Sequence, residues 1–213
     1  MNRQWLLAQW AELRWWKRYL KKREPAKYLL WKSEYWLRFL EICKLPSLSP
    51  GARVLDAGCG PAGIFMALSH YRVDAIDPLL AEYARLPHFR PDNYPWVRFY
   101  PVTLESFPGE ETYDLVFCVN AINHMEDVTR SAGLLYACLK PGGVLVVSAD
   151  VHKYRALRCL FRLLPLDVMH PFQEDHRGYR TLFSGAGFSE LNGFRYKKGL
   201  IFDYWVWKLQ KQT

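Results

Sequence analysis

The stretch Val54-Leu-Asp-Ala-Gly58-Cys-Gly60-Pro-Ala-Gly63 decides the fold, because a short apolar strand, a glycine-rich turn and a helix start follow one another directly. Glycines in such a turn let a ligand approach the backbone closely, and the helix start favours a carboxylate or a phosphate. The pattern Gly-x-Gly-x-x-Gly is weak on its own, since NAD-binding proteins and purely structural turns also contain it. The residues around it therefore have to identify the ligand.

Two carboxylates narrow the choice of ligand. Asp56 lies two residues before Gly58, where dinucleotide-binding folds typically have an apolar side chain, and it can receive an ammonium group. A purely structural role, in which Asp56 caps the loop, is the alternative. Asp77 ends the next expected strand, nineteen residues after Gly58, and its two oxygens can accept hydrogen bonds from both hydroxyls of a ribose. The turn and the two carboxylates together favour a ligand with a ribose and an amino group.

Strand-like and helix-like segments alternate beyond this turn. Apolar or β-branched runs predict strands, and the segments between them have helical periodicity. The strands are expected at 53–57, 72–77, 96–102, 115–119 and 144–148, and the helices at 63–71, 79–86, 128–139 and 179–186. Two strand-like stretches, at 191–196 and 200–209, come last. The order predicts an α/β fold with a doubly wound, mostly parallel sheet and an antiparallel C-terminal edge pair.

The N-terminal fifth of the chain has a composition of its own. Residues 1–44 contain eleven Lys and Arg against four Glu, a net charge of +7 out of +8 for the whole chain, and six of the nine Trp. Two amphipathic helices separated at Glu24-Pro25 are expected there. We therefore divide the chain into a basic, aromatic helical cap at 1–45 and an α/β domain at 46–213, with an insertion at about 151–176 that forms a lid.

Four segments in order resemble the successive signatures of class I S-adenosylmethionine-dependent methyltransferases: VLDAGCGPAG at 54–63, AIDP at 75–78, YDLVFCVNAINH at 113–124 and LKPGGVLVVS at 139–148. The resemblance covers about residues 53–150. It implies that the α/β domain is a Rossmann-like methyltransferase domain and that S-adenosylmethionine is its cofactor. The fourth segment also has a plain alternative, a turn that leads into a strand.

The resemblance implies roles for individual residues in donor binding. The turn that contains Gly58, Gly60 and Gly63 would hold the methionine part of the donor, with Asp56 near its amino group. The hydroxyls of the donor ribose would be bound by Asp77.

Further implied contacts concern the adenine and the methyl end. Leu79 would lie beside the adenine, and Asn120, at the end of the fourth strand, would face the methionine end. Members of the family usually have an acidic residue for the adenine amino group after the third strand, and the matching positions here are Thr103 and Leu104. This departure leaves the adenine contact open, with Glu105 as a substitute.

Methyl transfer needs a nucleophile aligned with the donor methyl, and some acceptors must also lose a proton. His124, just after Asn120, lies nearest to the expected methyl and is the candidate general base. Packing over the donor without a catalytic role is the alternative. Asp150, His152 and His170 lack the spacing of a metal site, so no metal is expected.

The acceptor is the part that the sequence determines least. The cap and the insertion offer Trp, Tyr, Phe and Leu to a substrate at the carboxyl ends of the strands, which favours a small apolar or aromatic acceptor, including a lipid. A nucleic acid such as RNA is the alternative that the basic cap suggests. However, the Asx-Pro-Pro-aromatic segment of amino-directed nucleic-acid enzymes is replaced by Asn120-Ala-Ile-Asn123. A donor-binding protein without catalytic activity is the second alternative.

The sequence also gives expectations about the cellular location of the protein and about what the first helix covers. No apolar run reaches the roughly 18 residues that span a bilayer, and charged residues interrupt the apolar start of the chain before a signal-peptide core can form. Five Cys without a C-x-x-C pair are expected to be reduced thiols. We expect a cytoplasmic protein. The Lys and Arg of the cap are either merely solvated or place the first helix in peripheral contact with the inner membrane surface. The first helix is expected to cover the acceptor alone, so that its loss leaves donor binding intact.

Overall fold

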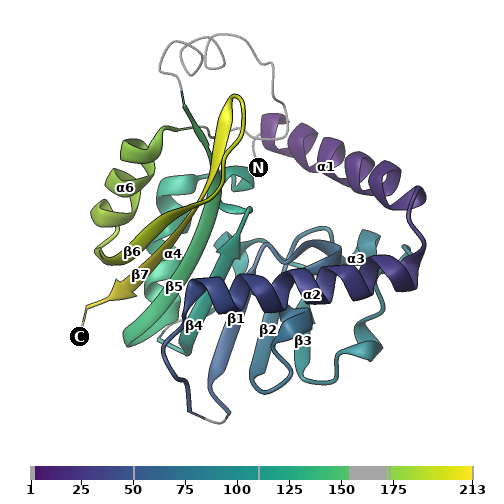
Figure 1. The fold of residues 1–213 in the computed structure, drawn as a ribbon, viewed down its shortest axis with the longest axis horizontal. Helices are drawn as coiled ribbons and strands as arrows, with labels where there is room; N and C mark the ends of the chain where they lie inside the picture. The colour runs from purple at the N-terminus through teal and green to yellow at the C-terminus, as the bar shows by residue number, and fades with distance from the viewer. Residues whose placement is uncertain (1–2, 50, 110, 154–171, 173, 213) are drawn as a thin grey trace.

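A computed structural model describes residues 3–49, 51–109, 111–153, 172 and 174–212. Within this part of the chain, the strands form one seven-stranded sheet in the order β3-β2-β1-β4-β5-β7-β6 (Figure 1). Strands β3, β2, β1, β4 and β5 are mutually parallel, whereas β7 pairs with β5 and with β6 in the antiparallel sense. The expected fold class, a mostly parallel sheet with an antiparallel C-terminal edge pair, is confirmed.

The strands begin and end close to the predicted positions. Their bounds are β1 Arg53–Ala57, β2 Arg72–Ile76, β3 Val97–Tyr100, β4 Tyr113–Val119, β5 Leu139–His152, β6 Phe188–Lys197 and β7 Phe202–Lys211. Strand β5 is longer than expected because nine of its residues pair with β7, from Val144 to His152.

Alternating side chains of the central strands build two apolar layers, one on each face of the sheet. On one face, Val116 and Cys118 pack with helices α4 (Val128–Cys138) and α6 (His176–Gly185). On the other face, Leu115 and Phe117 pack with helix α2 (Pro25–Cys43). The central strands are buried on both faces, which explains why they read as continuous apolar runs.

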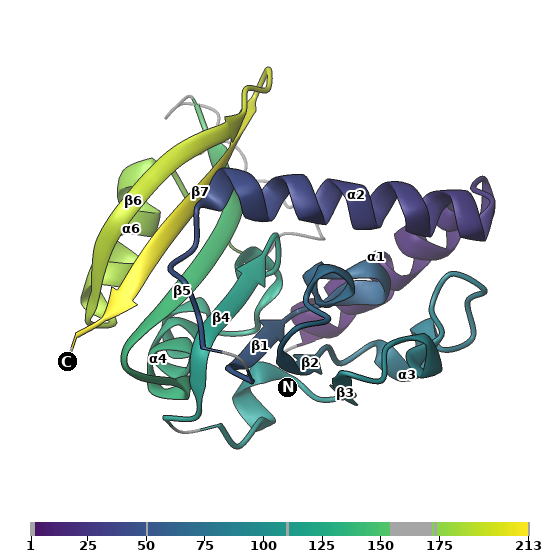
Figure 2. The ribbon, with the colours of Figure 1, turned by 60° about the horizontal axis from the view of Figure 1, so that its bottom comes forward.

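The two N-terminal helices are present as expected, α1 at Arg3–Lys21 and α2 at Pro25–Cys43. Glu24 caps α2, since its carboxylate accepts hydrogen bonds from the backbone amides of Ala26 and Lys27. Helix α2 crosses one face of the sheet, and α1 lies beyond the carboxyl ends of the parallel strands (Figures 1 and 2). None of the described helices has the length and apolarity to cross a membrane.

Two predicted helices differ in the structure. The segment 63–71 is not an α-helix: it contains the short 3-10 turn η2, Ile64–Ala67, and a second 3-10 turn, η1, precedes it at Gly60–Ala62. Gly63, between them, has an extended backbone, and the carboxylate of Asp56 accepts the amide hydrogen of Phe65. The segment 79–86 contains only the short helix α3, Leu80–Tyr83. Pro87 is consistent with this early end, since it has no amide hydrogen to donate to the carbonyl of Tyr83, four residues before it.

Most of the expected lid at 151–176 lies outside the described residues, together with His170. The flanks are described. His152, at the end of β5, donates its backbone amide to the carbonyl of Glu174 at 3.1 Å. The ring of His176, at the start of α6, lies 4.2 Å from the ring of Trp205 on β7.

Candidate active site

The glycine-rich turn leaves β1 at the carboxyl end of the sheet and needs its glycines. Gly58 and Gly60 have φ values of +74° and +57°, a region that side chains other than glycine rarely adopt. A Cβ atom on Gly58 would also collide with the side chain of Ala121, on the neighbouring loop after β4. The backbone of the turn is therefore open to a ligand, as the sequence predicts.

Asp77 follows β2 and anchors this turn. It is 6% exposed, and its two carboxylate oxygens accept the amide hydrogens of Gly60 at 3.0 Å and of Leu79 at 2.8 Å. Burial raises the pKa of Asp77 to about 6, although both hydrogen bonds lower it. Each oxygen keeps acceptor capacity, because a carboxylate oxygen has more than one lone pair. Asp77 can thus hold the turn and accept hydrogen bonds from a diol at once.

Asp56 lies beneath the turn and is 2% exposed. One of its oxygens accepts the amide hydrogen of Phe65 at 3.1 Å, and burial raises its pKa to about 7. A Cβ atom on Gly63 would come within 2.6 Å of the same carboxylate oxygen, so Gly63 is needed for this packing. Neither Asp56 nor Gly63 lines a cavity. Both support the turn from behind, and a contact of Asp56 with an ammonium group stays a prediction.

Two cavities meet above the turn. The inner cavity is lined by Asp77, Thr103 and Leu104 of the sheet end and by Gln9 of α1, and its volume is about 50 Å³. The aromatic cavity has a volume of about 440 Å³ and is walled by aromatic residues of the two N-terminal helices, Trp15, Trp16, Tyr19, Tyr28 and Trp36. Both cavities are lined by the same four residues, Glu12, Gly58, Asn120 and His124, so they form one continuous site.

Helix α1 borders both cavities, and this corrects the expectation that it covers the acceptor alone. Trp5, Gln9 and Glu12 line the inner cavity beside Asp77. The helix is fixed there by a hydrogen bond of 3.0 Å from Trp5 Nε1 to the backbone oxygen of His124. Loss of α1 would therefore remove one wall of the inner cavity, so we no longer expect the inner cavity to keep its affinity for a ligand without this helix.

His124 ends the short turn η5, Ile122–His124, after β4. Its Nδ1 atom lies 3.6 Å from Oε2 of Glu12, and both side chains are largely buried. Burial, followed by the nearby Asp77 carboxylate, raises the pKa of Glu12 to about 8. His124 thus borders both cavities, as expected for a candidate base, and has an acidic neighbour that the sequence did not predict.

Asn120 lies at the junction of the two cavities. It has a φ of +55°, which asparagine tolerates better than most residues, and its amide donates to the carbonyl oxygen of Ser148 at 3.1 Å. This conformation turns the chain sharply after β4. Asn120 is exposed there and lines both cavities.

The residues predicted near an adenine are only partly brought together. Thr103 and Leu104 line the inner cavity, but Thr103 donates its hydroxyl hydrogen to Ser106. Glu105 also lines this cavity, and its carboxylate accepts a hydrogen bond from Ser131 at 3.1 Å. Leu79 lines neither cavity, because its backbone is bound to Asp77 and its side chain packs in the core.

Sequence reasoning missed the polar residues of the cap. Gln9 and Glu12 of α1 and Lys32 of α2 all line the site. Gln9 Oε1 is buried without a hydrogen-bond partner among the described residues. A signal was present, since Gln9 and Glu12 share a helix face with Trp5 and Trp16, four, seven and eleven residues apart. Polar side chains inside an otherwise apolar helix face indicate a site rather than a core.

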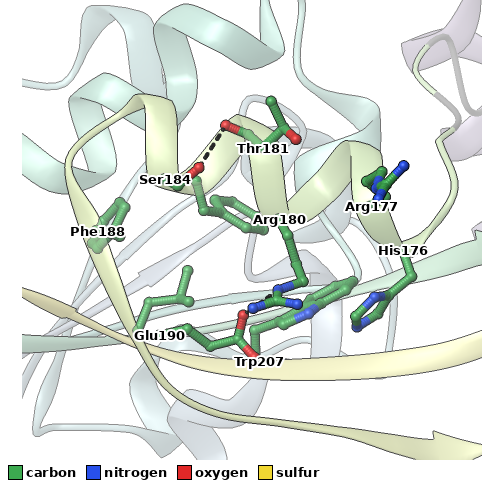
Figure 3. Close-up of a pocket in the computed structure, with 10 residues that line it drawn as sticks. His176, Arg177, Arg180, Thr181, Ser184, Phe188, Glu190 and Trp207 are labelled. Atoms are coloured by element: carbon green, nitrogen blue, oxygen red, sulfur yellow. Dashed lines mark hydrogen bonds and ion pairs between the residues drawn. The ribbon is translucent and has the colours of Figure 1, made fainter.

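A further hollow of about 490 Å³ lies between α6 and the strands β6 and β7 (Figure 3). Trp207 lies along one side of it, and Arg180 and Glu190 point toward each other across it, with 2.7 Å between their charged atoms. None of the residues that the sequence analysis singled out for donor binding lines this hollow. Among the residues that the structure describes, no group of three or more His, Cys, Asp or Glu is arranged to hold a metal ion.

Comparison with protein families gives one match that covers most of the chain. A family model described as a methyltransferase domain matches residues 19–191. A ubiquinone biosynthesis O-methyltransferase of Rickettsia canadensis is 29% identical over 157 residues, which are 70% of this chain and 66% of the relative. A tRNA U34 carboxymethyltransferase of Methylococcus capsulatus is 34% identical over 138 residues, 61% of this chain and 41% of the relative. The chain thus spans less than two thirds of the length of these curated relatives.

Solved structures share the fold at low sequence identity. A 1,6-didemethyltoxoflavin-N1-methyltransferase of Burkholderia thailandensis, with its substrate and S-adenosylhomocysteine bound, has a TM-score of 0.63 and 18% identity. The likeness covers 98% of this chain and 88% of that one. A [4+2]-cyclase has a TM-score of 0.64 and 16% identity, covering 83% and 80% of the two chains. The fold alone therefore occurs with more than one kind of reaction.

Proposed function

Because the chain belongs to the methyltransferase-domain family of Rossmann-like proteins, we propose that it transfers a methyl group from S-adenosylmethionine to a small, apolar or aromatic acceptor, lipids included. The observation that carries the proposal is the junction of the two cavities. An inner cavity lined by Asp77, whose carboxylate can accept hydrogen bonds from a diol, opens at Gly58 into a cavity walled by five aromatic residues. Donor and acceptor can meet at that junction.

The donor fits the groups of the inner cavity. In the proposed arrangement, Asp77 accepts hydrogen bonds from the ribose hydroxyls, and the turn at Gly58 and Gly60 lies along the methionine part. The unpartnered oxygen of Gln9 can accept a hydrogen from the adenine amino group, beside Thr103 and Leu104. Gln9 would thereby replace the acidic residue that the family usually has after β3.

The small volume of the inner cavity implies that α1 moves when the donor binds. Ligand pockets typically enclose about 300–1,000 Å³, whereas side chains of α1 narrow this cavity to about 50 Å³. An adenosine can enter only when Trp5, Gln9 and Glu12 give way. We therefore expect α1 to shift outward as the donor binds and to close over it afterwards.

When bound, S-adenosylmethionine supplies an electrophilic methyl group on a sulfonium. His124 is placed to take the proton that an oxygen or nitrogen acceptor releases, because it borders both cavities. Glu12, with Oε2 3.6 Å from Nδ1, keeps the ring at the border of the two cavities. The aromatic walls exclude water and align the acceptor with the methyl group.

Two alternatives remain as outcomes of the test. Nucleic acid is favoured by the tRNA-modifying relative and by the net charge of +7 of residues 1–44, but the Asx-Pro-Pro-aromatic segment is missing. Donor binding without methyl transfer is favoured by the [4+2]-cyclase that shares the fold. The aromatic walls favour a small apolar or aromatic acceptor, since ligand pockets for such molecules are lined mainly by apolar and aromatic side chains.

Peripheral membrane contact is a further part of the proposal. Several large apolar side chains of the cap are exposed, among them Trp10 at 56% and Trp31 at 51%, and they lie among Lys and Arg. A basic helix with exposed tryptophans binds anionic lipid surfaces. A cytoplasmic location at such a surface would give the site access to lipid acceptors.

Calorimetry with S-adenosylmethionine, S-adenosylhomocysteine and NAD tests the donor, and binding of NAD in preference to the other two would refute the proposal. The acceptor is tested by incubating the protein with cell extract and radiolabelled donor. Label in the lipid or small-molecule fraction supports the proposed acceptor class. Label in RNA supports the first alternative, and donor binding without any labelled product supports the second.

A further inference from the structure

Helix α2 is anchored directly over the donor turn. Trp36 Nε1 donates a hydrogen bond of 2.9 Å to the carbonyl oxygen of Ala62, within the segment Gly58 to Gly63. Lys32 lies one helical turn before Trp36, so both side chains are on the same face of α2. The anchor at Trp36 therefore fixes the position of Lys32 above the turn.

Aromatic rings hold the ammonium group of Lys32 in place. Its Nζ atom lies 4.4 Å from the ring centre of Trp36 and 4.6 Å from that of Tyr35. Such cation–π contacts stabilise a cation but do not neutralise it. Burial lowers the pKa of Lys32 to about 8, which shows that the shielded charge is costly.

The charge of Lys32 has no ionic partner among the described residues. None of their carboxylates lies within 4 Å of its ammonium group, and Asp56, which attracts it, is buried beneath the turn and lies outside the cavity. Lys32 is the one Lys or Arg among the described residues that lines the aromatic cavity, which Gly58, Cys59 and Gly60 of the turn also line. A desolvated cation of this kind is stabilised by an anion that arrives with the ligand.

We propose that Lys32 binds the carboxylate of the methionine part of the donor. The inference rests on the proposed function, in which the turn at Gly58 and Gly60 lies along that part of the molecule. The methionine part is a zwitterion, and the groups near this turn carry both signs: Lys32 and Asp150 line the aromatic cavity, and Asp56 and Asp77 hold the turn by hydrogen bonds. Lys32 is the cation among them that can meet the carboxylate, and the ammonium group has carboxylates nearby.

Two other roles for Lys32 would give different results. The aliphatic stem and ammonium of Lys32 can serve only to cover Tyr35 and Trp36, a structural role without a ligand. Alternatively, the anion belongs to the acceptor. The position favours the donor, because Trp36, one helical turn after Lys32, is bound to Ala62 of the turn, whereas the junction of the two cavities is lined by His124 and Asn120.

The test compares two donors that differ in one group. Decarboxylated S-adenosylmethionine keeps the ammonium group and lacks the carboxylate. In calorimetry, the protein should bind S-adenosylmethionine at least about tenfold more tightly than the decarboxylated compound. This is the difference expected for one charge-assisted hydrogen bond in a shielded site. Lys32→Met should abolish this preference and leave the affinity for the decarboxylated compound within about twofold. Lys32→Arg should keep most of the preference, because it keeps the charge.

A matched control is Lys27→Met, an exposed lysine of the same helix, which should bind both donors as the unchanged protein does. If the unchanged protein binds neither donor, the proposed function fails. If it binds both equally well, or if Lys32→Met keeps the preference, only the role of Lys32 is refuted. Equal weakening of both donors by Lys32→Met, with a lower unfolding temperature, would assign Lys32 to the structural role and overturn the inference.

Discussion

The site is built from two regions that differ in how they hold polar groups. At the sheet end, each buried carboxylate is already engaged by backbone amides, Asp56 by Phe65 and Asp77 by Gly60 and Leu79. In the cap, polar side chains face the same space with fewer bonds, since Gln9 Oε1 has no partner among the described residues and Lys32 has only aromatic rings.

This difference separates a preformed scaffold from groups that a ligand must complete. A buried polar atom without a partner costs free energy, and a ligand that supplies the partner recovers it. The sheet end therefore fixes the geometry of the donor turn before binding, whereas the cap gains its remaining contacts on binding. Substitutions in the two regions should therefore differ in how much they lower the affinity for the donor. They should also differ in whether they lower or raise the stability of the free protein.

Replacement of Asp77 by alanine is expected to have the largest effect. It removes two hydrogen bonds to ribose, at about 1.5–3 kcal/mol each when one partner is charged, and also releases the amides of Gly60 and Leu79. Affinity for S-adenosylhomocysteine in calorimetry should fall at least about tenfold. Asp92→Ala, at an exposed carboxylate outside the site, is the control. Normal binding by a folded Asp77→Ala protein would break the assignment of ribose to the sheet end.

Replacement of Gln9 by leucine should have a smaller effect on the same affinity. A neutral hydrogen bond contributes about 0.5–1.5 kcal/mol, so the affinity for S-adenosylhomocysteine should fall about 2- to 10-fold. The free protein should not be destabilised, because Gln9 Oε1 has no partner to lose among the described residues. The S-inosyl analogue, which has an oxygen in place of the adenine amino group, should bind the variant and the unchanged protein with similar affinity. A loss of the same size for both ligands would contradict the contact with the amino group.

Replacement of Glu12 by glutamine tests whether the raised pKa of Glu12 makes the stability of the protein depend on pH. The pKa of Glu12 is raised from 4.5 to about 8, so the folded protein holds its proton more tightly than the unfolded chain does. This contribution to stability is fully present below about pH 4.5 and is lost as the pH rises through about 8. Asp56 and Asp77, with pKa values raised to about 7 and 6, act in the same direction.

Thermal unfolding between pH 5 and 9 measures this effect. The unfolding temperature of the unchanged protein should fall over this range, and at pH 9 that of Glu12→Gln should be higher by about 2–4 °C for each kcal/mol relieved. Glu34→Gln, an exposed residue of α2, should follow the unchanged protein. Parallel curves for Glu12→Gln and the unchanged protein would show that Glu12 does not titrate in the cavity.

The sheet end could be predicted from the sequence to a greater extent than the cap. The parallel strands, the turn and the position of Asp77 could be predicted, because strands buried on both faces leave continuous apolar runs in the sequence and the turn requires glycines. The helix predicted at 63–71 is only the short turn η2, because the amide of Phe65 is bound by the side chain of Asp56 and not by a helical carbonyl. Gln9 and Lys32 could not be assigned, because their role depends on how two helices cross the sheet end, and periodicity does not determine that.

The smallest expected effect concerns the outer face of the cap. Trp10 and Trp31 are exposed at 56% and 51%, and the guanidinium of Arg14 lies 5.2 Å from the ring centre of Trp10. Together with the positive charge of residues 1–44, these side chains should bind the protein weakly to vesicles with anionic lipids, and salt should reduce the bound fraction. The variant Trp10→Ser/Trp31→Ser should lower the bound fraction in co-sedimentation to roughly half, since it leaves the charges in place. Leu200→Ser, which removes a side chain that is 90% exposed outside the cap, is the matched control. Equal sedimentation of the double variant and the unchanged protein would remove the membrane contact and leave the donor site untouched, because neither Trp10 nor Trp31 lines either cavity.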